Sequence, residues 1–371
     1  MAGRHPLGEP KRPHQRGRRP PHLKSGGTPV ARRTSFRRSL GHRVAATLAV
    51  LAAGGILGSV AWHSSRAAAP PRPGRAALRA VAAAHAARST RPIRWIPAGT
   101  SLPFPLHEPD AVLAIYGQPQ LLYAKNITQQ GPIASTTKLM TAYLVAESLP
   151  MNQVVVISPS AAATGGSDMR MYPGERFTVR QLLTGMLMVS ANDAAVALAQ
   201  AVSGHTAAFV ALMNRTAQSL GLHHTHYADP DGISPGSSSS AGDLLRLAEL
   251  DLQIPVLRQI MRTKTASLPN NPIVININGI LWRDPTVIGL KTGWTSQAAC
   301  TLVFAAQRTV NGYPVTLVGV LLHAQLFATE YADAESLLNW GYGTIAPTVD
   351  VLAFDHQMPG TLNPQGAIGG P

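Results

Sequence analysis

The chain has 371 residues, of which 45% are hydrophobic and 13% are charged. That composition suits one large domain or two ordinary ones, and it excludes a wholly disordered protein. The formal net charge of +14 taken alone favours nucleic acid or an anionic membrane surface as a partner. The single cysteine, Cys300, excludes a disulfide framework and a cysteine-rich zinc site.

The positive charge is confined to the first part of the chain. Residues 1–107 contain 19 Lys and Arg against one acid, Glu9, whereas residues 108–371 carry a net charge of −4. Among the arginines of residues 1–43 there is one aromatic residue, Phe36, so base stacking has little support. We therefore expect no nucleic-acid partner, and we interpret the leader as a membrane-topology signal.

Three consecutive segments precede the main body. Residues 1–43 are rich in Arg, Pro, Gly and His and are expected to be a disordered, basic, cytoplasmic segment. Residues 44–65 form a run of 22 residues without a formal charge, which predicts a transmembrane signal-anchor. The more basic flank precedes this run, so the N-terminus is expected in the cytoplasm and the body in the periplasm or cell-wall space. Residues 66–105 are an Ala/Pro/Arg-rich tether, and cleavage of the anchor stays open.

Residues 106–345 are predicted to be the folded domain, followed by a C-terminal tail over 346–371. Strands at both ends of this domain with helices between them predict an α/β (α+β) fold, a mainly antiparallel sheet packed with helices. Thr178 and Gln181 form a capping box before one helix, and Asn311-Gly312 is a hairpin signal. The expected strands are 111–116, 120–125, 302–307 and 315–322, and the expected helices are 135–148, 179–188, 193–202, 207–220 and 328–340.

Three short motifs carry candidate chemistry. They are Ser135-Thr136-Thr137-Lys138, then Ser190-Ala191-Asn192, then Lys291-Thr292-Gly293. Each is common by chance when taken alone, but the three together in this order favour an acyl-transfer site.

The residue types in the motifs match what acyl transfer needs. A serine hydroxyl is a weak nucleophile until a base takes its proton, and Lys138 lies one helical turn after Ser135. A second cation, Lys291, would favour the neutral amine on Lys138. Ser190 and Asn192 can relay a proton and hydrogen-bond a substrate amide. Lys291 with Thr292 can hold a carboxylate, and Gly293 leaves room for an extended peptide at a strand edge.

From about residue 111 to residue 343 the sequence resembles the serine D-Ala-D-Ala carboxypeptidases, the low-molecular-mass penicillin-binding proteins. Besides the three motifs, the segments that carry the likeness are GGSDMRMYPGERFTVRQLLTGMLMVSANDAAVALA, AFVALMNRTAQSLGL, YADPDGIS and NINGILW. The resemblance implies a penicilloyl-serine transferase fold, similar to that of the β-lactamases, in which a mostly helical subdomain accompanies the sheet.

The resemblance also implies roles for single residues. Ser135 would be the acylated nucleophile, Lys138 its base, and Ser190 and Asn192 the partners from the second motif. The expected substrate is the D-Ala-D-Ala end of a peptidoglycan stem peptide, and β-lactam antibiotics are the expected covalent inhibitors. No metal or cofactor is expected.

The third motif would bind the substrate. Lys291 and Thr292 would hold the substrate carboxylate beside Gly293 and Trp294. The backbone N–H groups of Ser135 and Trp294 would form the oxyanion hole.

The sequence departs from the family at several places. Ile133 stands where a proline often precedes the Ala-Ser pair, Trp294 replaces a more usual His or Tyr, and Ala298-Ala299 replaces Ala-Gly. Arg308 is the last basic residue apart from histidine, whereas some relatives have an arginine on a later strand, where this chain has His323-Ala324-Gln325. Because this arginine is missing, the strength of the requirement for a free substrate carboxylate stays open.

Three other functions remain alternatives. A D,D-endopeptidase that cuts peptidoglycan cross-links would use the same residues. A serine β-lactamase is less favoured, because Glu249 is the one glutamate between the second and third motifs, and it lies in the helical run LLRLAEL. A non-catalytic wall-binding scaffold is disfavoured by the intact Ser135, Lys138 and Lys291.

Some conspicuous residues receive structural interpretations. His223, His224 and His226 are expected in a surface loop rather than at a metal. Cys300 is expected to be a small buried residue. Asp193 is expected to support a helix N-terminus electrostatically.

Overall fold

The computed structural model describes residues 101–119 and 121–347. Contacts divide the chain into two units, Met1–Arg66 and Ala67–Pro371, and every described residue lies in the second. The predicted disordered segment and membrane span lie outside the described residues, as do nearly all of the predicted tether and tail. These four assignments stay predictions.

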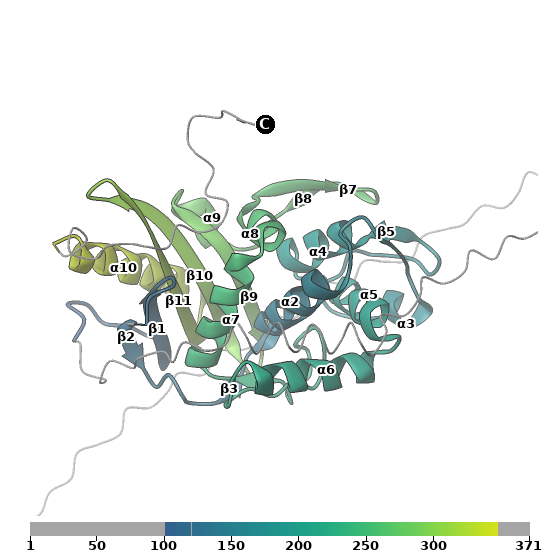
Figure 1. Ribbon diagram of the computed structural model, residues 1–371, viewed down its shortest axis with the longest axis horizontal. Coiled ribbons are helices and arrows are strands. Elements are labelled where there is room, and N and C mark those ends of the chain that lie inside the picture. Colours follow the sequence, from purple (N-terminus) through teal and green to yellow (C-terminus); the bar gives the residue numbers. More distant parts are fainter. Residues whose placement is uncertain (1–100, 120, 348–371) are drawn as a thin grey trace, which may run out of the picture. The chain divides into compact units, whose positions relative to one another are not determined.

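A five-stranded antiparallel sheet organises the domain, with strand order β2-β1-β11-β10-β9 (Figure 1). Both predicted strand pairs are confirmed, although β10 and β11 extend beyond the predicted bounds and meet at the Asn311-Gly312 turn. The motif Lys291-Thr292-Gly293 lies in β9, an edge strand whose second edge is not paired in this sheet. The strands are β1 (Asp110–Ile115), β2 (Leu121–Lys125), β9 (Val287–Thr295), β10 (Ala299–Val310) and β11 (Tyr313–Ala324).

The sheet is buried on both faces because successive side chains of a strand point to opposite sides. In β1, Val112 and Ala114 belong to one hydrophobic cluster, whereas Leu113 and Ile115 belong to another. Helix α10 (Phe327–Ile345) packs on β10 and β11 and, with α9 (Ile280–Arg283), contributes to the second cluster (Figure 1).

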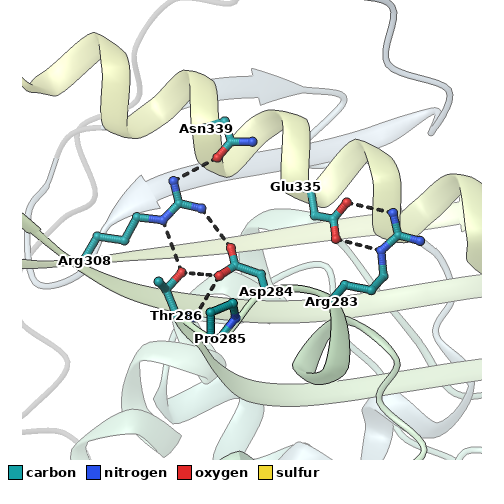
Figure 2. A pocket seen from close by; sticks show the side chains of 7 residues that line it. All are labelled: Arg283, Asp284, Pro285, Thr286, Arg308, Glu335 and Asn339. Atoms are coloured by element: carbon teal, nitrogen blue, oxygen red, sulfur yellow. Dashed lines mark hydrogen bonds and ion pairs between the residues drawn. The ribbon is translucent and has the colours of Figure 1, made fainter.

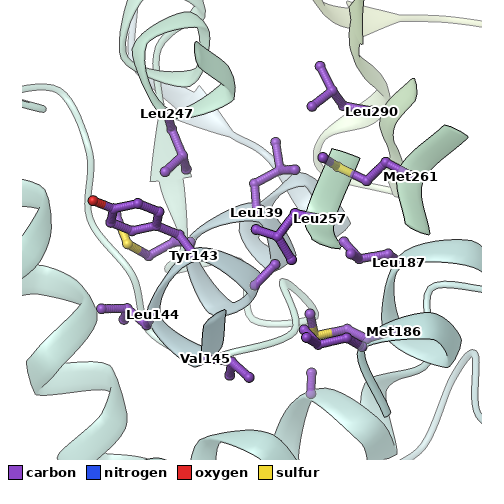
Figure 3. Packing of buried hydrophobic residues seen from close by; sticks show 14 of the residues in the cluster. Leu139, Tyr143, Leu144, Val145, Met186, Leu187, Leu247, Leu257, Met261 and Leu290 are labelled. Carbon is purple, nitrogen blue, oxygen red and sulfur yellow. The ribbon is translucent and has the colours of Figure 1, made fainter. Parts of the chain in front are cut away.

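The first cluster continues from the sheet into the helices. The central helix is α2 (Lys138–Ser148), whose first eight residues are all buried. It is flanked by α7 (Ala241–Gln253) and α8 (Pro255–Arg262). Figure 3 shows apolar side chains from these three helices, from α4 (Val179–Met188) and from β9 converging around α2: Leu139, Tyr143, Leu144, Val145, Met186, Leu187, Leu247, Leu257, Met261 and Leu290.

Four further helices form the mostly helical part around α2 (Figure 1). The capping box predicted at Thr178 and Gln181 is present, with the Gln181 N–H donating to Thr178 Oγ1 and the Thr178 N–H to Gln181 Oε1. The predicted fold class, an antiparallel sheet with helices and a helical subdomain, is confirmed. The helices are α3 (Pro159–Ala162), α4 (Val179–Met188), α5 (Asn192–Ser203) and α6 (Thr206–Ser219).

Three two-stranded sheets were not predicted, because their strands are short and carry weak alternation. The pair β7 (Thr265–Leu268) and β8 (Asn271–Ile275) even contains Pro272, which a strand with a free edge tolerates. The other pairs are β3 (Gly131–Pro132) with β6 (Ser238–Ser239), and β4 (Val154–Val156) with β5 (Arg176–Thr178).

In the described part of the chain, no one helix has both the length and the apolar character needed to cross a membrane. Helices α5 and α6 together meet that test by length and composition, with a bend of 83° between them.

Buried acidic side chains lie between α10 and the segment before β1. Glu108 is fully buried beside Asp333, and the Asp333 carboxylate accepts hydrogen bonds of 2.9 Å from the backbone and Nδ1 of His107. Burial, then the neighbouring Asp333 carboxyl group, raises the pKa of Glu108 to about 8. Burial, then the Glu108 charge, raises the pKa of Glu330 to about 9. Both carboxyl groups are therefore protonated in the folded protein at neutral pH.

The folded protein is expected to lose stability as the pH rises, and Glu330→Gln is expected to remove part of that loss. A carboxyl whose folded pKa is raised stabilises the fold fully below its unfolded value, and that stability is lost as pH rises through the folded pKa. The wild-type melting temperature should therefore fall between about pH 5 and pH 9, and Glu330→Gln should recover about 5 °C at pH 9. Glu335→Gln is the control on the same helix, since its ion pair with Arg283 is at the surface. Identical pH profiles for wild type and Glu330→Gln would refute this.

Candidate active site

The turn that carries Ser135 is fixed by one carbonyl oxygen. The Ile133 oxygen accepts from the backbone N–H and Oγ1 of Thr136, at 3.2 and 2.6 Å, and from Thr301 Oγ1 of β10 at 3.2 Å. Ala134 has φ +47°, and Ser135 lies in a 3₁₀ turn over Ala134–Thr137 that leads into α2. The predicted helix start at Ser135 is therefore a tighter turn, with the α-helix beginning at Lys138.

Lys138 is completely buried and its amine contacts three oxygen atoms. The Nζ atom donates to Ser135 Oγ at 2.9 Å, to Asn192 Oδ1 at 2.7 Å and to the Asp231 carbonyl oxygen at 2.5 Å. The first contact is the one that a general base needs with its nucleophile.

Burial lowers the pKa of Lys138 to about 8, against the opposing effect of three carboxyl groups: Asp231, Asp229 and Asp193. Burial also lowers the pKa of Lys291 well below its ordinary value, and the Lys138 charge lowers it further. The sequence predicts that Lys291 favours the neutral amine on Lys138. In the structure, burial is the main cause of the lowered pKa of Lys138, and repulsion between the two ammonium groups disfavours the state in which both amines are charged.

The second motif lies beside Lys138. Ser190 has φ +62° and its Oγ accepts from Lys291 Nζ at 3.2 Å. Asn192 begins α5, and besides contacting Lys138 it donates from Nδ2 to the Gly165 oxygen at 2.8 Å and from its backbone to the Ser167 oxygen at 2.7 Å. Both predicted residues are thus in the same site as the nucleophile.

The third motif brings the edge of β9 against the nucleophile. A Cβ atom on Gly293 would lie 2.8 Å from the backbone nitrogen of Ser135 and 2.5 Å from Thr301 Oγ1, so only glycine allows this approach. Thr292 is buried, whereas Trp294 is 60% exposed. The Ser135 N–H therefore lies beside β9, where the sequence predicts an oxyanion hole.

The structure adds a loop that received no role from the sequence. The Asp231 carbonyl oxygen binds Lys138, and Asp229 fixes the loop by accepting from the Gly232 N–H at 2.9 Å, the Ser234 N–H at 2.5 Å and Ser237 Oγ at 2.8 Å. The string Asp-Pro-Asp-Gly indicates a tight turn. Its position against Lys138 depends on tertiary contacts that the string does not encode.

Asp193 does more than support a helix start. It accepts from the Ala194 N–H at 2.7 Å, as predicted for the first turn of α5. Both carboxylate oxygens also accept from the Met169 N–H at 3.0 Å, so the side chain holds the preceding loop to the helix.

A histidine–aspartate pair lies at the end of β11, in the stretch His323-Ala324-Gln325. His323 Nδ1 contacts Asp110 Oδ2 at 2.7 Å, and its Nε2 contacts the Pro132 carbonyl oxygen at 3.1 Å, just before Ile133. The pair stabilises the chain that leads to Ser135.

The other residues singled out in the sequence are placed as follows. Glu249 lies in α7, as expected, and its Oε1 accepts from the Gly117 N–H at 3.3 Å. Cys300 is buried, as predicted, opposite Trp294 in the sheet, and burial raises its pKa to about 11. Among residues 101–119 and 121–347, no three His, Cys, Asp or Glu side chains are arranged to hold a metal ion.

A hollow of about 380 Å³ between α10 and the β9–β10 layer contains none of the predicted site residues (Figure 2). Its two arginines are neutralised: Arg283 pairs with Glu335 through two contacts of 2.7 Å, and Arg308 pairs with Asp284 at 2.8 Å. The candidate site is therefore the meeting point of the three motifs.

Comparison with known proteins finds relatives of one enzyme family. The family model for D-alanyl-D-alanine carboxypeptidase matches residues 105–325. The chain is 37% identical over 251 residues to the D-alanyl-D-alanine endopeptidase of Pseudomonas aeruginosa, covering 66% of this chain and 80% of that protein. It is 35% identical over 208 residues to the D-alanyl-D-alanine carboxypeptidase DacF of Bacillus subtilis, covering 53% of this chain and 54% of that relative.

A solved structure shares the fold. The D-alanyl-D-alanine carboxypeptidase from Mycobacterium tuberculosis superposes with a TM-score of 0.62 at 30% identity, covering 67% of this chain and 96% of that chain. All three motifs lie within the part of the chain that the family model matches.

Proposed function

Because the chain belongs to the D-alanyl-D-alanine carboxypeptidase family, we propose that it is a serine D,D-carboxypeptidase that removes the terminal D-alanine from peptidoglycan stem peptides. The observation that carries this function is the 2.9 Å contact between Lys138 Nζ and Ser135 Oγ, made by a lysine whose pKa is about 8. Such an amine is partly neutral near physiological pH and can accept the serine proton.

Acylation would begin when neutral Lys138 takes the proton of Ser135. The Ser135 oxygen then forms a bond to the carbonyl carbon of the penultimate D-alanine. The negative charge that develops on the carbonyl oxygen would be stabilised by the backbone N–H groups of Ser135 and Trp294. When the peptide bond breaks, the leaving amine takes up a proton that Lys138 can return through Ser190. Water then cleaves the ester in a second cycle of the same proton transfers.

The substrate would lie along the free edge of β9, as an added strand. Gly293 permits this approach, and Lys291 with Thr292 would bind the terminal carboxylate. Lys291 is buried without a carboxylate partner among the described residues, so an incoming substrate carboxylate would raise its pKa again and favour its charged form.

Release of D-alanine from a synthetic pentapeptide should be measured first, with mass spectrometry of all products. A carboxypeptidase releases one D-alanine per pentapeptide monomer, and this activity should disappear in Ser135→Ala. Failure of folded wild type to release D-alanine from any D-Ala-D-Ala peptide would contradict the proposed activity.

A D,D-endopeptidase is the second candidate, since a relative of 37% identity has that name and this chain has no arginine after Arg308. Without that arginine, a free terminal carboxylate would be recognised less strongly. Cross-linked dimers supplied beside pentapeptide monomers separate the two functions. Faster consumption of dimers would favour the endopeptidase.

Residues 44–65 would anchor the protein in the cytoplasmic membrane, with the N-terminus in the cytoplasm and the catalytic domain outside. The support is the uncharged run and its basic flank. N-terminal sequencing of the mature protein tests this: an intact leader supports the anchor, and a new N-terminus after residue 59 would contradict it.

A further inference from the structure

The buried amine of Lys138 lacks an ionic hydrogen-bond partner. Its three acceptors are a hydroxyl, a side-chain amide oxygen and a backbone carbonyl. An ammonium can donate to all three, whereas the neutral amine can donate to two and accept the proton of Ser135. The balance between these two forms is therefore set by more distant charges.

The charged groups that face Lys138 come from three elements. The Asp229–Ser234 loop contributes Asp231 and Asp229, α5 contributes Asp193, and β9 contributes Lys291. Among the carboxyl groups, Asp231 has the strongest effect on Lys138, and the same residue binds Lys138 through its backbone.

Asp231 is held in an unusual setting for a carboxyl group. Only 5% of the residue is exposed, and its Oδ1 accepts from the Ile233 N–H at 3.3 Å. It lies against Asp229, whose two carboxylate oxygens are already fixed by three donors. Two adjacent carboxyl groups resist being charged together, and burial followed by the hydrogen bond to Asp229 raises the pKa of Asp231 to about 7.

We propose that Asp231 is a positioning residue for the nucleophile's base: by holding or releasing its proton beside Asp229, it sets the pH range in which Lys138 can activate Ser135. This role rests on the proposed function of Ser135 and Lys138. When Asp231 is protonated, Lys138 loses the negative charge that stabilises its ammonium form most, and the neutral amine is favoured. When Asp231 is ionised, the ammonium is stabilised and acylation requires a higher pH.

Asp231→Asn tests this role, because asparagine keeps the backbone carbonyl and the side-chain shape but cannot ionise. The rate constant for labelling the full-length protein with a fluorescent penicillin would be measured from about pH 5.5 to pH 9.5. The wild-type rate should rise with pH around the Lys138 pKa, near 8. In Asp231→Asn the midpoint should move about one pH unit lower. The rate relative to its alkaline plateau should differ most between the pKa of Asp231, near 7, and that of Lys138, and the difference should vanish well below pH 7, where wild-type Asp231 is uncharged as well.

Asp168→Asn is the matched control. Asp168 is exposed on the neighbouring loop and is not among the groups that act on Lys138, so its midpoint should equal that of wild type. Asp231→Ser is a second variant without a carboxyl group, and it should shift the midpoint in the same direction even if its plateau is lower.

The outcomes separate this inference from the proposed function. If wild type is never labelled at any pH, the function of Ser135 and Lys138 is refuted. If wild type is labelled with a pH-dependent rate but both Asp231 variants keep its midpoint, or shift it upward, only the role of Asp231 is refuted.

Discussion

Replacement of Lys138 by methionine is expected to slow acylation of Ser135 by about 10³-fold, within the range lost when a general base is removed. Methionine fills a similar volume but cannot take the Ser135 proton, which the Lys138 amine approaches through its 2.9 Å contact with Ser135 Oγ. The pH dependence attributed to the Lys138 pKa, near 8, should disappear together with the rate. The labelling rate with a fluorescent penicillin measures both effects.

Lys264→Met is the control for this substitution, since Lys264 is exposed and lies over the ring of Trp282. It should label at the wild-type rate. Folding of Lys138→Met should be intact or improved, because a buried charge without an ionic partner is costly to the folded state. A folded Lys138→Met protein that labels within tenfold of wild type would show that another group activates Ser135.

Gly232→Ala is expected to lower the free energy of unfolding by about 3 kcal/mol and to reduce acylation as well. Gly232 has φ +79°, and a Cβ atom there would lie 1.9 Å from the Ala134 carbonyl oxygen and 2.9 Å from Thr137 Oγ1. Either the loop or the nucleophile turn must move. Movement of the loop withdraws the Asp231 oxygen from Lys138.

Gly117→Ala is the control for Gly232→Ala, because it introduces the backbone strain without the steric clash. Gly117 has φ +73°, but nothing lies within 4 Å of the Cβ position, so only the cost of a left-handed alanine applies, about 1 kcal/mol. Urea unfolding and penicillin labelling of both variants would measure the difference. Equal stability losses in the two variants, with wild-type labelling in Gly232→Ala, would refute the close packing of the loop against the nucleophile.

The sequence predicts the parts of the fold that local chemistry decides. The capping box at Thr178 and Gln181 places the start of α4 correctly, and Asn311-Gly312 places the turn between β10 and β11. The β7–β8 pair was not predicted, because short strands interrupted by Pro272 carry no periodic signal. Pairing of β1 with β11 brings together segments from opposite ends of the domain, which no local pattern specifies.

The sequence likewise predicts some features of the candidate site and not others. The spacing of Ser135 and Lys138 along one turn is visible in the sequence, and the structure brings both together with Ser190, Asn192 and Lys291. The complete burial of Lys138 results from the packing of α2 among the surrounding helices and β9, so the cause of its lowered pKa could not be predicted.

The Asp229–Ser234 loop is the part of the site whose role could least be predicted from the sequence. Its turn could be predicted from Asp-Pro-Asp-Gly, but its contact with Lys138 depends on a Gly232 that lies directly against Ala134. The charge near the site also differs from the +14 of the whole chain, since three aspartates face Lys138. The two lysines of the site therefore act in a locally acidic environment.

Mass spectrometry of the full-length protein after incubation with a penicillin tests whether Ser135 is the nucleophile. We expect one covalent penicilloyl adduct per chain, located by peptide mapping on Ser135 and lost in folded Ser135→Ala. Folded wild type that forms no adduct, or an adduct on another residue that persists in Ser135→Ala, would contradict it.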